Sequence, residues 1–198
     1  MLKLFHAPQS RSTRIIWLLE ELGANYEIEY MNIPRMDGSG SSDPANPHPD
    51  KKVPALVHDG TLITESVAVV LYLTDLYPEA RIGPRVGDSK RGTYLTWLAY
   101  YAGVVEPVIT LEFLKMVDNP ALARTFRGRP EMDARILDAL AKNEFIVGNG
   151  LTGVDVIFGS LGHWFRSALP AGQRVDAYIK ACTSRPAFAR AMLKDKPA

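Results

Sequence analysis

The stretch that decides the fold is VPALVHDGTLITES, residues 53–66. Residues 53–57 are apolar and predict a strand. Asp59-Gly60 is a strong hairpin turn, and residues 61–63 supply the returning strand. Glu65-Ser66 then opens a helix, because a serine hydroxyl suits a helix start. This stretch therefore predicts the unit strand, strand, helix.

The residues before this stretch predict a strand, a helix and another strand. Residues 2–5 are a short apolar strand. Apolar residues then recur at i, i+3, i+4 and i+7, which is one face of a helix: Ile15, Leu18, Leu19 and Leu22. Gly23 follows, where a helix end often needs a positive φ. Residues 26–30 alternate tyrosine or isoleucine with glutamate, which is strand periodicity. Residues 1–77 are therefore predicted as one βαβ-ββα domain.

The rest of the chain predicts a loop, a linker and a helical domain. Residues 34–52 are rich in Pro, Gly and Ser, and a loop of this length is usually functional or disordered. Residues 78–87 contain Pro78, Pro84, Gly83 and Gly87 and are predicted as a domain linker. Residues 88–198 are expected to be all helical, with helices over 88–116, 130–145, 152–165, 175–183 and 186–193, the first of them kinked at Pro107. The expected fold class is α/β followed by all-α.

Composition excludes several classes of protein. The chain has 198 residues, with 23 Lys and Arg against 22 Asp and Glu, so its formal net charge is +1. This balance gives no electrostatic reason to expect nucleic acid or a membrane surface as a partner. The single cysteine, Cys182, excludes an internal disulfide framework. The four histidines are scattered without metal-ligand spacing, so no metal is expected. We expect a cytoplasmic protein with no spanning helix and no signal peptide.

Three short motifs carry possible chemistry. The first places hydroxyls and arginines at a predicted helix start, which favours an anion, and covers Ser10, Arg11, Ser12, Thr13 and Arg14. The second is Val53-Pro54, where a proline at strand entry presents the Val53 backbone. The third is Glu65-Ser66, a carboxylate and a helix start suited to the ammonium and carboxylate of an amino acid. Each motif taken alone has an ordinary alternative, a helix cap or a strand-entry proline.

A fourth motif concerns folding. Leu151-Thr152-Gly153-Val154-Asp155 predicts a capping box, with Thr152 at the N-cap and Asp155 at N3. Gly159 and Gly162, inside the same helix, predict close packing against a neighbour, since glycine destabilises a helix by roughly 1 kcal/mol relative to alanine.

Taken together, these features resemble the cytosolic glutathione transferases over nearly the whole chain. The residues that carry the resemblance are Ser10–Arg14, Trp17–Gly23, His48–Leu56, Asp59-Gly60, Thr64–Ser66 and Leu151–Asp155. The resemblance implies a thioredoxin-like first domain that binds glutathione as co-substrate, and a homodimer. It further implies a cis Val53-Pro54 bond and pairing of the Val53 backbone with the cysteinyl part of glutathione.

The resemblance also implies roles for other residues. Glu65 and Ser66 would hold the γ-glutamyl end, and Lys52, with Lys51 or His48 as weaker candidates, the glycyl carboxylate. A family pattern often has glycine at the position of Lys51. Ser10 would donate a hydrogen bond to the thiolate, aided by Arg11, with Ser12 left open as the donor instead. Because Arg11 stands where the beta-class enzymes have a cysteine, a mixed-disulfide mechanism is not favoured.

The electrophile pocket is the least specified part of the prediction. By the resemblance it would be lined by His6, Tyr101, Glu106 and Trp164 and would take a small hydrophobic electrophile. The expected activity is glutathione transfer, as in detoxification. The alternatives are another glutathione reaction on the same scaffold (isomerisation, dehalogenation or peroxide reduction) and a non-catalytic glutathione-binding regulatory protein.

Overall fold

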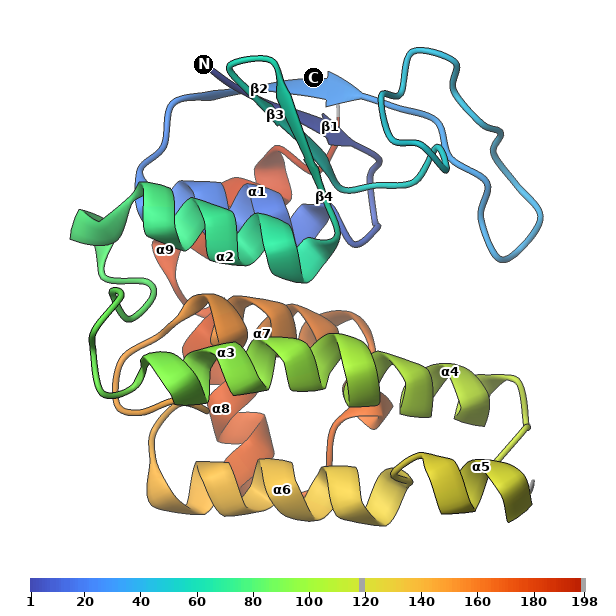
Figure 1. The fold of residues 1–198 in the computed structure, drawn as a ribbon, viewed down its shortest axis with the longest axis vertical. Helices are drawn as coiled ribbons and strands as arrows, with labels where there is room; N and C mark the ends of the chain where they lie inside the picture. Colours follow the sequence, from blue (N-terminus) through green and yellow to red (C-terminus); the bar gives the residue numbers. More distant parts are fainter. Residues whose placement is uncertain (118–119, 197–198) are drawn as a thin grey trace. The chain divides into compact units, whose positions relative to one another are not determined.

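A computed structural model describes residues 1–117 and 120–196 (Figure 1). The chain divides into two compact units. The first unit is Met1–Ile82 together with the C-terminal segment that begins at Ser184, and the second is Gly83–Thr183. The sequence had placed the C-terminal segment with the helical domain of residues 88–198, so the structure differs there.

The first unit is built on a four-stranded sheet in the order β2-β1-β3-β4. The strands are β1 Leu2–His6, β2 Tyr26–Tyr30, β3 Ala55–His58 and β4 Thr61–Thr64. β1 pairs in parallel with β2 and antiparallel with β3, which is antiparallel to β4. The parallel pair is joined through a helix and the antiparallel pair through a tight turn, as such pairs require. This confirms the predicted βαβ-ββα order.

Three helices cover one face of this sheet (Figure 1). They are α1 Thr13–Leu22, α2 Ser66–Leu76 and α9 Pro186–Leu193, and a short 3-10 turn, η1 Pro78–Ala80, follows α2. The predicted apolar face of α1 is buried, and Gly23 ends that helix with φ of 62°. Residues 31–54 contain no helix or strand.

Apolar packing and ion pairs explain why α9 belongs to the first unit. The Phe188 ring meets the Trp17 ring of α1 edge-on, with centroids 5.0 Å apart. Arg185 donates to both carboxylate oxygens of Glu21, at 2.6 and 2.7 Å. Such charge-assisted bidentate pairs are among the stronger polar contacts in proteins. Sequence periodicity correctly predicted α9 as a helix but carried no information about which unit it packs against.

The second unit is helical in its described residues. Its helices are α3 Arg91–Tyr100, the π-helix η2 Tyr101–Val105, α4 Glu106–Phe113, α5 Pro120–Thr125, α6 Arg129–Lys142, α7 Gly153–Trp164, the 3-10 turn η3 Arg166–Ala168 and α8 Gln173–Thr183. The predicted helix over 88–116 is thus α3, η2 and α4 in succession. The π-helix ends two residues before Pro107, whose ring crowds the carbonyl four residues earlier and whose nitrogen cannot donate. Helix α5 was not predicted.

The start of α7 confirms the predicted capping box. The Asp155 carboxylate accepts hydrogen bonds from the backbone N–H and the hydroxyl of Thr152, both at 2.8 Å. It also accepts from the Ile146 backbone N–H at 2.9 Å and from the Tyr178 hydroxyl at 3.1 Å. Gly162 is closely packed as predicted, because a Cβ there would lie 2.7 Å from the side chain of Ile179.

Within the described residues, no helix is long and apolar enough to cross a membrane.

A cluster of charges at the end of α1 makes stability depend on pH. Burial acts to raise the pKa of Glu20, but hydrogen bonds from Lys194, Tyr26 and Arg190 outweigh it and lower that pKa to about 2. Lys194 and Arg190 lie 2.6 and 2.7 Å from the carboxylate. Because the folded pKa lies below the unfolded one, this stabilisation is present above about pH 4.5 and is lost as pH falls toward 2.

We therefore expect Glu20→Gln to lower the free energy of unfolding at pH 7 by about 1–2 kcal/mol, a value that allows for the exposure of both cations. The difference from the wild type should shrink between about pH 5 and pH 2. Urea denaturation at several pH values measures it. Glu27→Gln is the matched control, because Glu27 is 51% exposed and its ion pair with Lys3 is solvated. An equal effect of both substitutions would contradict this account.

Candidate functional site

The register of the sheet brings the three sequence motifs to one end. Phe5 of β1 lies opposite Ala55 of β3, and Ala55 lies opposite Thr64 of β4. Continuing the same antiparallel register places Val53 opposite Ala7. The loop after β1, the residues before β3 and the residues after β4 therefore lie at the same end of the sheet. The structure thus brings together the motifs at residues 10–14, 53–54 and 65–66.

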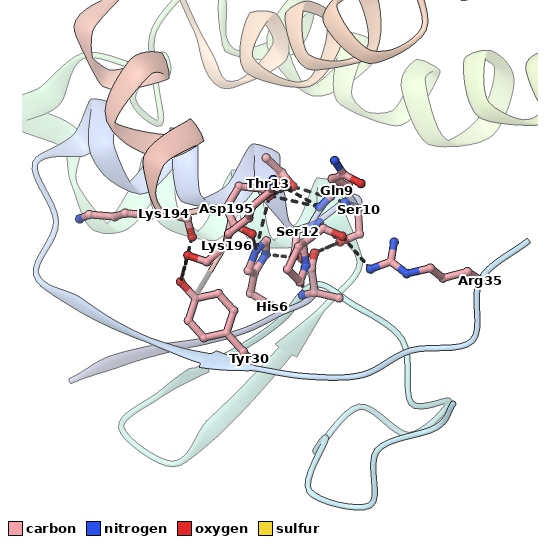
Figure 2. Close-up of polar contacts among 12 residues, drawn as sticks. His6, Gln9, Ser10, Ser12, Thr13, Tyr30, Arg35, Lys194, Asp195 and Lys196 are labelled. Carbon is pink, nitrogen blue, oxygen red and sulfur yellow. Dashed lines mark hydrogen bonds and ion pairs between the residues drawn. The ribbon is translucent and has the colours of Figure 1, made fainter. Parts of the chain in front are cut away.

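The loop from Ala7 to Ser12 is organised by two serine hydroxyls (Figure 2). The Oγ atoms of Ser10 and Ser12 lie 2.8 Å apart. Ser10 Oγ donates to the Ala7 carbonyl at 2.7 Å and accepts from the Ser12 backbone N–H at 3.2 Å. Ser12 stands at the N-cap of α1 but makes no side-chain capping bond, so the simple cap alternative does not describe it. Ser10 is half-buried and Ser12 is fully buried.

His6 lies beneath this loop. It is the third residue on the buried face of β1 after Leu2 and Leu4, so the strand period itself buries the ring. Its Nδ1 atom lies 2.8 Å from Ser12 Oγ, and its Nε2 atom lies 3.1 Å from the backbone oxygen of Asp195. Burial lowers the pKa of His6, against the opposing backbone hydrogen bond and charge of Asp195. His6 was expected to line a pocket, whereas here it presents no exposed surface.

Asp195 ties the C-terminal segment to this loop, as Figure 2 shows. Its carboxylate accepts from the Gln9 backbone N–H, at 3.1 Å for the nearer oxygen, and from the Thr13 hydroxyl. The Tyr30 hydroxyl lies 3.0 Å from the backbone oxygens of Lys194 and of Lys196. Sequence analysis missed Asp195, since no local pattern relates it to residues more than 180 positions earlier.

Arg35 was also missed. Its Nη2 atom donates to the Pro8 carbonyl at 2.8 Å, which joins the long loop after β2 to the loop that carries Ser10 (Figure 2). The composition of residues 34–52 indicated a functional loop, but Arg35 itself carried no distinguishing signal.

The segment before β3 has the predicted cis bond between Val53 and Pro54. In the turn before this bond, Lys51 adopts the left-handed backbone conformation, with φ of 54°. The family pattern often has glycine at this position, the residue that adopts this conformation most readily. Lys51 Nζ donates to the Asn46 backbone oxygen at 2.7 Å, and His48 is buried with Nδ1 accepting from the Asp50 N–H. Lys52 is exposed. Of these three residues, Lys52 is thus the best placed for a ligand.

Glu65 occupies a strained position at the start of α2. Its φ of 65° and ψ of 120° are uncommon for a residue with a side chain. Such strain clusters where a side chain or backbone must meet a ligand. Glu65 is exposed, and no residue within the described ranges pairs with its carboxylate. Ser66, half-buried, is the first residue of the helix.

The other predicted pocket residues belong to the second unit. Tyr101 is buried, with its ring edge-on to Phe158 and centroids 5.2 Å apart. Glu106 opens α4 and is half-buried, whereas Trp164 ends α7 and is 44% exposed. The grouping of these three residues around one pocket stays a prediction, and the fully buried His6 offers such a pocket no surface. Across residues 1–117 and 120–196, no group of three or more His, Cys, Asp or Glu side chains is arranged to hold a metal ion.

An α/β unit with these motifs at one sheet end, followed by a helical unit, defines a thioredoxin-like protein with a helical second domain. Comparison with known proteins agrees. Residues 1–75 match the family described as glutathione S-transferase, N-terminal domain. Glutathione S-transferase GstA of Escherichia coli O157:H7 is 26% identical over 191 residues, covering 93% of this chain and 94% of that protein.

Solved structures are similar over almost the full length. A glutathione S-transferase from Actinobacillus pleuropneumoniae is 26% identical, with a TM-score of 0.79 and coverage of 98% of this chain and 93% of the other. A sphingomonad glutathione S-transferase solved with glutathione is 25% identical, with a TM-score of 0.78 and coverage of 99% and 100%. Residues 1–75 thus match the N-terminal domain of the glutathione S-transferases, and the chain as a whole is similar to glutathione S-transferases of known structure.

The contacts of Asp195 lead to a direct prediction. Asp195→Ala removes the acceptor of the Gln9 N–H, a hydrogen bond to a charged group. We expect hydrogen exchange at the Gln9 amide to accelerate by about 10- to 100-fold. The amide of Leu4 in β1 should change little. Lys196→Ala, at an exposed neighbouring residue, is the control variant. Unchanged exchange at Gln9 in Asp195→Ala would show that the carboxylate does not hold the loop.

Proposed function

We propose that the protein is a glutathione S-transferase that binds glutathione at the end of the first unit's sheet and activates its thiol for attack on an electrophilic carbon. The observation that carries this proposal is the register of β1, β3 and β4, which brings the loop after β1, the residues before β3 and the residues after β4 to the same end of the sheet. The bound glutathione in the similar sphingomonad structure supports it.

Glutathione is a tripeptide with an ammonium group, two carboxylates and a thiol, and the site offers a counterpart for each. The Glu65 carboxylate suits the ammonium group of the γ-glutamyl end. The Ser66 hydroxyl and the free N–H groups at the start of α2 suit the neighbouring carboxylate. In this arrangement the Val53 backbone pairs with the cysteinyl residue, and Lys52 meets the glycyl carboxylate.

The chemical task is to keep the thiol ionised. A thiol with a pKa of about 8.5 is only a few per cent thiolate at neutral pH. Lowering that pKa by two units requires about 2.7 kcal/mol of preferential stabilisation of the thiolate. A hydrogen bond to a charged sulfur contributes about 1.5–3 kcal/mol, and the N-terminus of α1 about 0.3–1 kcal/mol. A hydroxyl at residue 10 or 12, with Arg11 beside it, is therefore sufficient in magnitude.

The reaction then proceeds by nucleophilic substitution or addition. The thiol proton passes to solvent, and the sulfur lone pair forms a carbon–sulfur bond with the electrophile. A leaving group, where there is one, departs with its bonding electron pair. We assign the electrophile to a pocket lined by residues of the second unit, with Tyr101, Glu106 and Trp164 as candidates. The Glu106 carboxylate would disfavour anionic electrophiles.

We further propose that the protein is cytoplasmic and forms a homodimer.

Binding is tested by thermal denaturation with reduced glutathione at millimolar concentration. At about 100 times Kd the ligand stabilises the folded state by about 2.7 kcal/mol, which raises Tm by roughly 5–10 °C. An unchanged Tm would overturn the proposed function. If glutathione binds but neither aromatic halides nor hydroperoxides are turned over, the protein is a glutathione-binding protein without this activity.

Glu65 is proposed to bind the γ-glutamyl end, whereas the hydroxyls of the loop after β1 stabilise the thiolate, and this difference gives a separate prediction. Glu65→Ala should weaken glutathione binding by about 10- to 100-fold, the loss of one charge-assisted hydrogen bond. The pKa of the bound thiol should change much less, because Glu65 serves the γ-glutamyl end. Calorimetric titration measures the affinity and thiolate absorbance the pKa. Glu29→Ala, at an exposed position of β2, is the matched control. A large change in thiol pKa with unchanged affinity would contradict this division.

A further inference from the structure

A pocket in the second unit is not part of the proposed glutathione site. It lies between the C-terminal half of α4 and the segment that joins α5 to α6, three helices that Figure 1 labels. Its volume is about 350 Å³, which is within the range of small-molecule sites in proteins. Its lining residues all belong to the second unit. The pocket is therefore defined by contacts within one compact unit.

The walls of this pocket are mainly apolar. The apolar lining residues are Val108, Leu111, Val117, Leu122, Phe126 and Pro130. Val108 is buried, whereas Val117 and Phe126 are 50% and 52% exposed, so the pocket reaches from the packed interior to the surface. An apolar molecule bound there would cover the exposed parts of Val117 and Phe126, and removing apolar surface from water is favourable.

The charged groups that line the pocket balance one another. Glu112 accepts a hydrogen bond from Arg129 at 3.0 Å, and Glu131 accepts one from the Gly128 backbone N–H at 3.0 Å. With the exposed Arg127, the lining holds two carboxylates and two guanidinium groups. A charged ligand would give up water on entering the apolar part of the pocket without a net opposite charge to replace it. The lining therefore favours an uncharged ligand.

Volume and chemistry narrow the class of ligand further. A dry apolar cavity of about 150 Å³ admits benzene, so a pocket of about 350 Å³ has room for two aromatic rings. Among its described lining residues there is no Ser, Cys, His or Lys, and the two carboxylates already accept hydrogen bonds. A side chain that could act as an activated nucleophile is therefore missing from this lining, which suits binding rather than reaction.

The pocket lies on a different face of α4 from the candidate electrophile residue Glu106. Val108, Leu111 and Glu112 follow Glu106 by two, five and six residues. At 3.6 residues per turn, they are rotated from it by about 140–240° around the helix axis. Neither Tyr101 nor Trp164, the other candidates of the second unit, lines the pocket. The pocket is therefore not a part of the predicted electrophile site.

We propose that this pocket is a second binding site, which takes a small uncharged hydrophobic molecule of about two aromatic rings and holds it without converting it. The site goes beyond the proposed transferase activity and does not depend on it, because glutathione contributes nothing to the pocket walls.

The first test titrates the unliganded protein with naphthalene and follows its methyl groups by NMR. We expect saturable shifts at the methyl groups of Val108, Leu111 and Leu122, caused by the ring current of the bound naphthalene. Shifts that are absent up to the solubility limit, or that occur only at Tyr101 and Trp164, would overturn the proposal. Because no glutathione is present, this result is separable from a failure of the proposed function.

The second test compares two phenylalanines through the same methyl signals. Phe126→Ala should weaken naphthalene binding at the pocket by about 10-fold, since it removes part of the apolar wall. Phe113→Ala is the matched control, because Phe113 is 61% exposed, belongs to α4 and does not line the pocket. It should leave the affinity unchanged. An equal loss in both variants would overturn the proposal. If Phe126→Ala does not fold, the shifts of the wild type decide.

The third test addresses the charge of the ligand. Naphthalene-2-carboxylate has the same rings and one negative charge, so we expect it to bind at the pocket at least about 10-fold more weakly than naphthalene. The methyl shifts of Val108, Leu111 and Leu122 measure both affinities. Equal or tighter binding of the carboxylate would overturn the assignment of an uncharged ligand.

Discussion

The pairing register of β1, β3 and β4 is the constraint on which the rest of the site depends. It sets Phe5 opposite Ala55 and Ala55 opposite Thr64. The loop after β1, the residues before β3 and the residues after β4 therefore lie at one end of the sheet. Side chains alternate along a strand, and a slip by one residue would turn His6 to the opposite face of β1. The same register therefore buries His6 under the loop and places Glu65 after β4 at the same end of the sheet.

The C-terminal segment, although distant in sequence, contacts the loop after β1 at this end of the sheet. The ion pairs of Glu20 and Glu21 hold α9 and the residue after it against α1, and Asp195 then reaches the loop of Gln9 and Thr13. The loop that is proposed to carry the thiolate donor is thus braced by residues that are distant in sequence. The same contacts stabilise the fold and shape the site. The ion pairs that hold α9 against α1 also bring the Asp195 carboxylate within hydrogen-bonding distance of Gln9 and Thr13.

Local patterns predicted those parts of the structure that local physics determines. The succession of strands and helices in residues 1–77, the hairpin at Asp59-Gly60 and the capping box of Asp155 depend on residues close in sequence, and the structure confirms them. The glycine at position 162 predicted close packing but not its partners, Ile179 and Leu169. The partners of His6 and the position of α9 depend on tertiary packing, which no spacing encodes. The π-helix before Pro107 shows a third case, since the proline predicted a kink but not the wider turn that accommodates it.

The most direct measurement of the central claim is a crystal structure with reduced glutathione bound. The account predicts that the sulfur lies within hydrogen-bonding distance of Ser10 Oγ, that the cysteinyl backbone pairs with that of Val53, and that the ammonium group meets Glu65. Glutathione bound elsewhere, or with its sulfur directed away from Ser10 and its ammonium group away from Glu65, would contradict it.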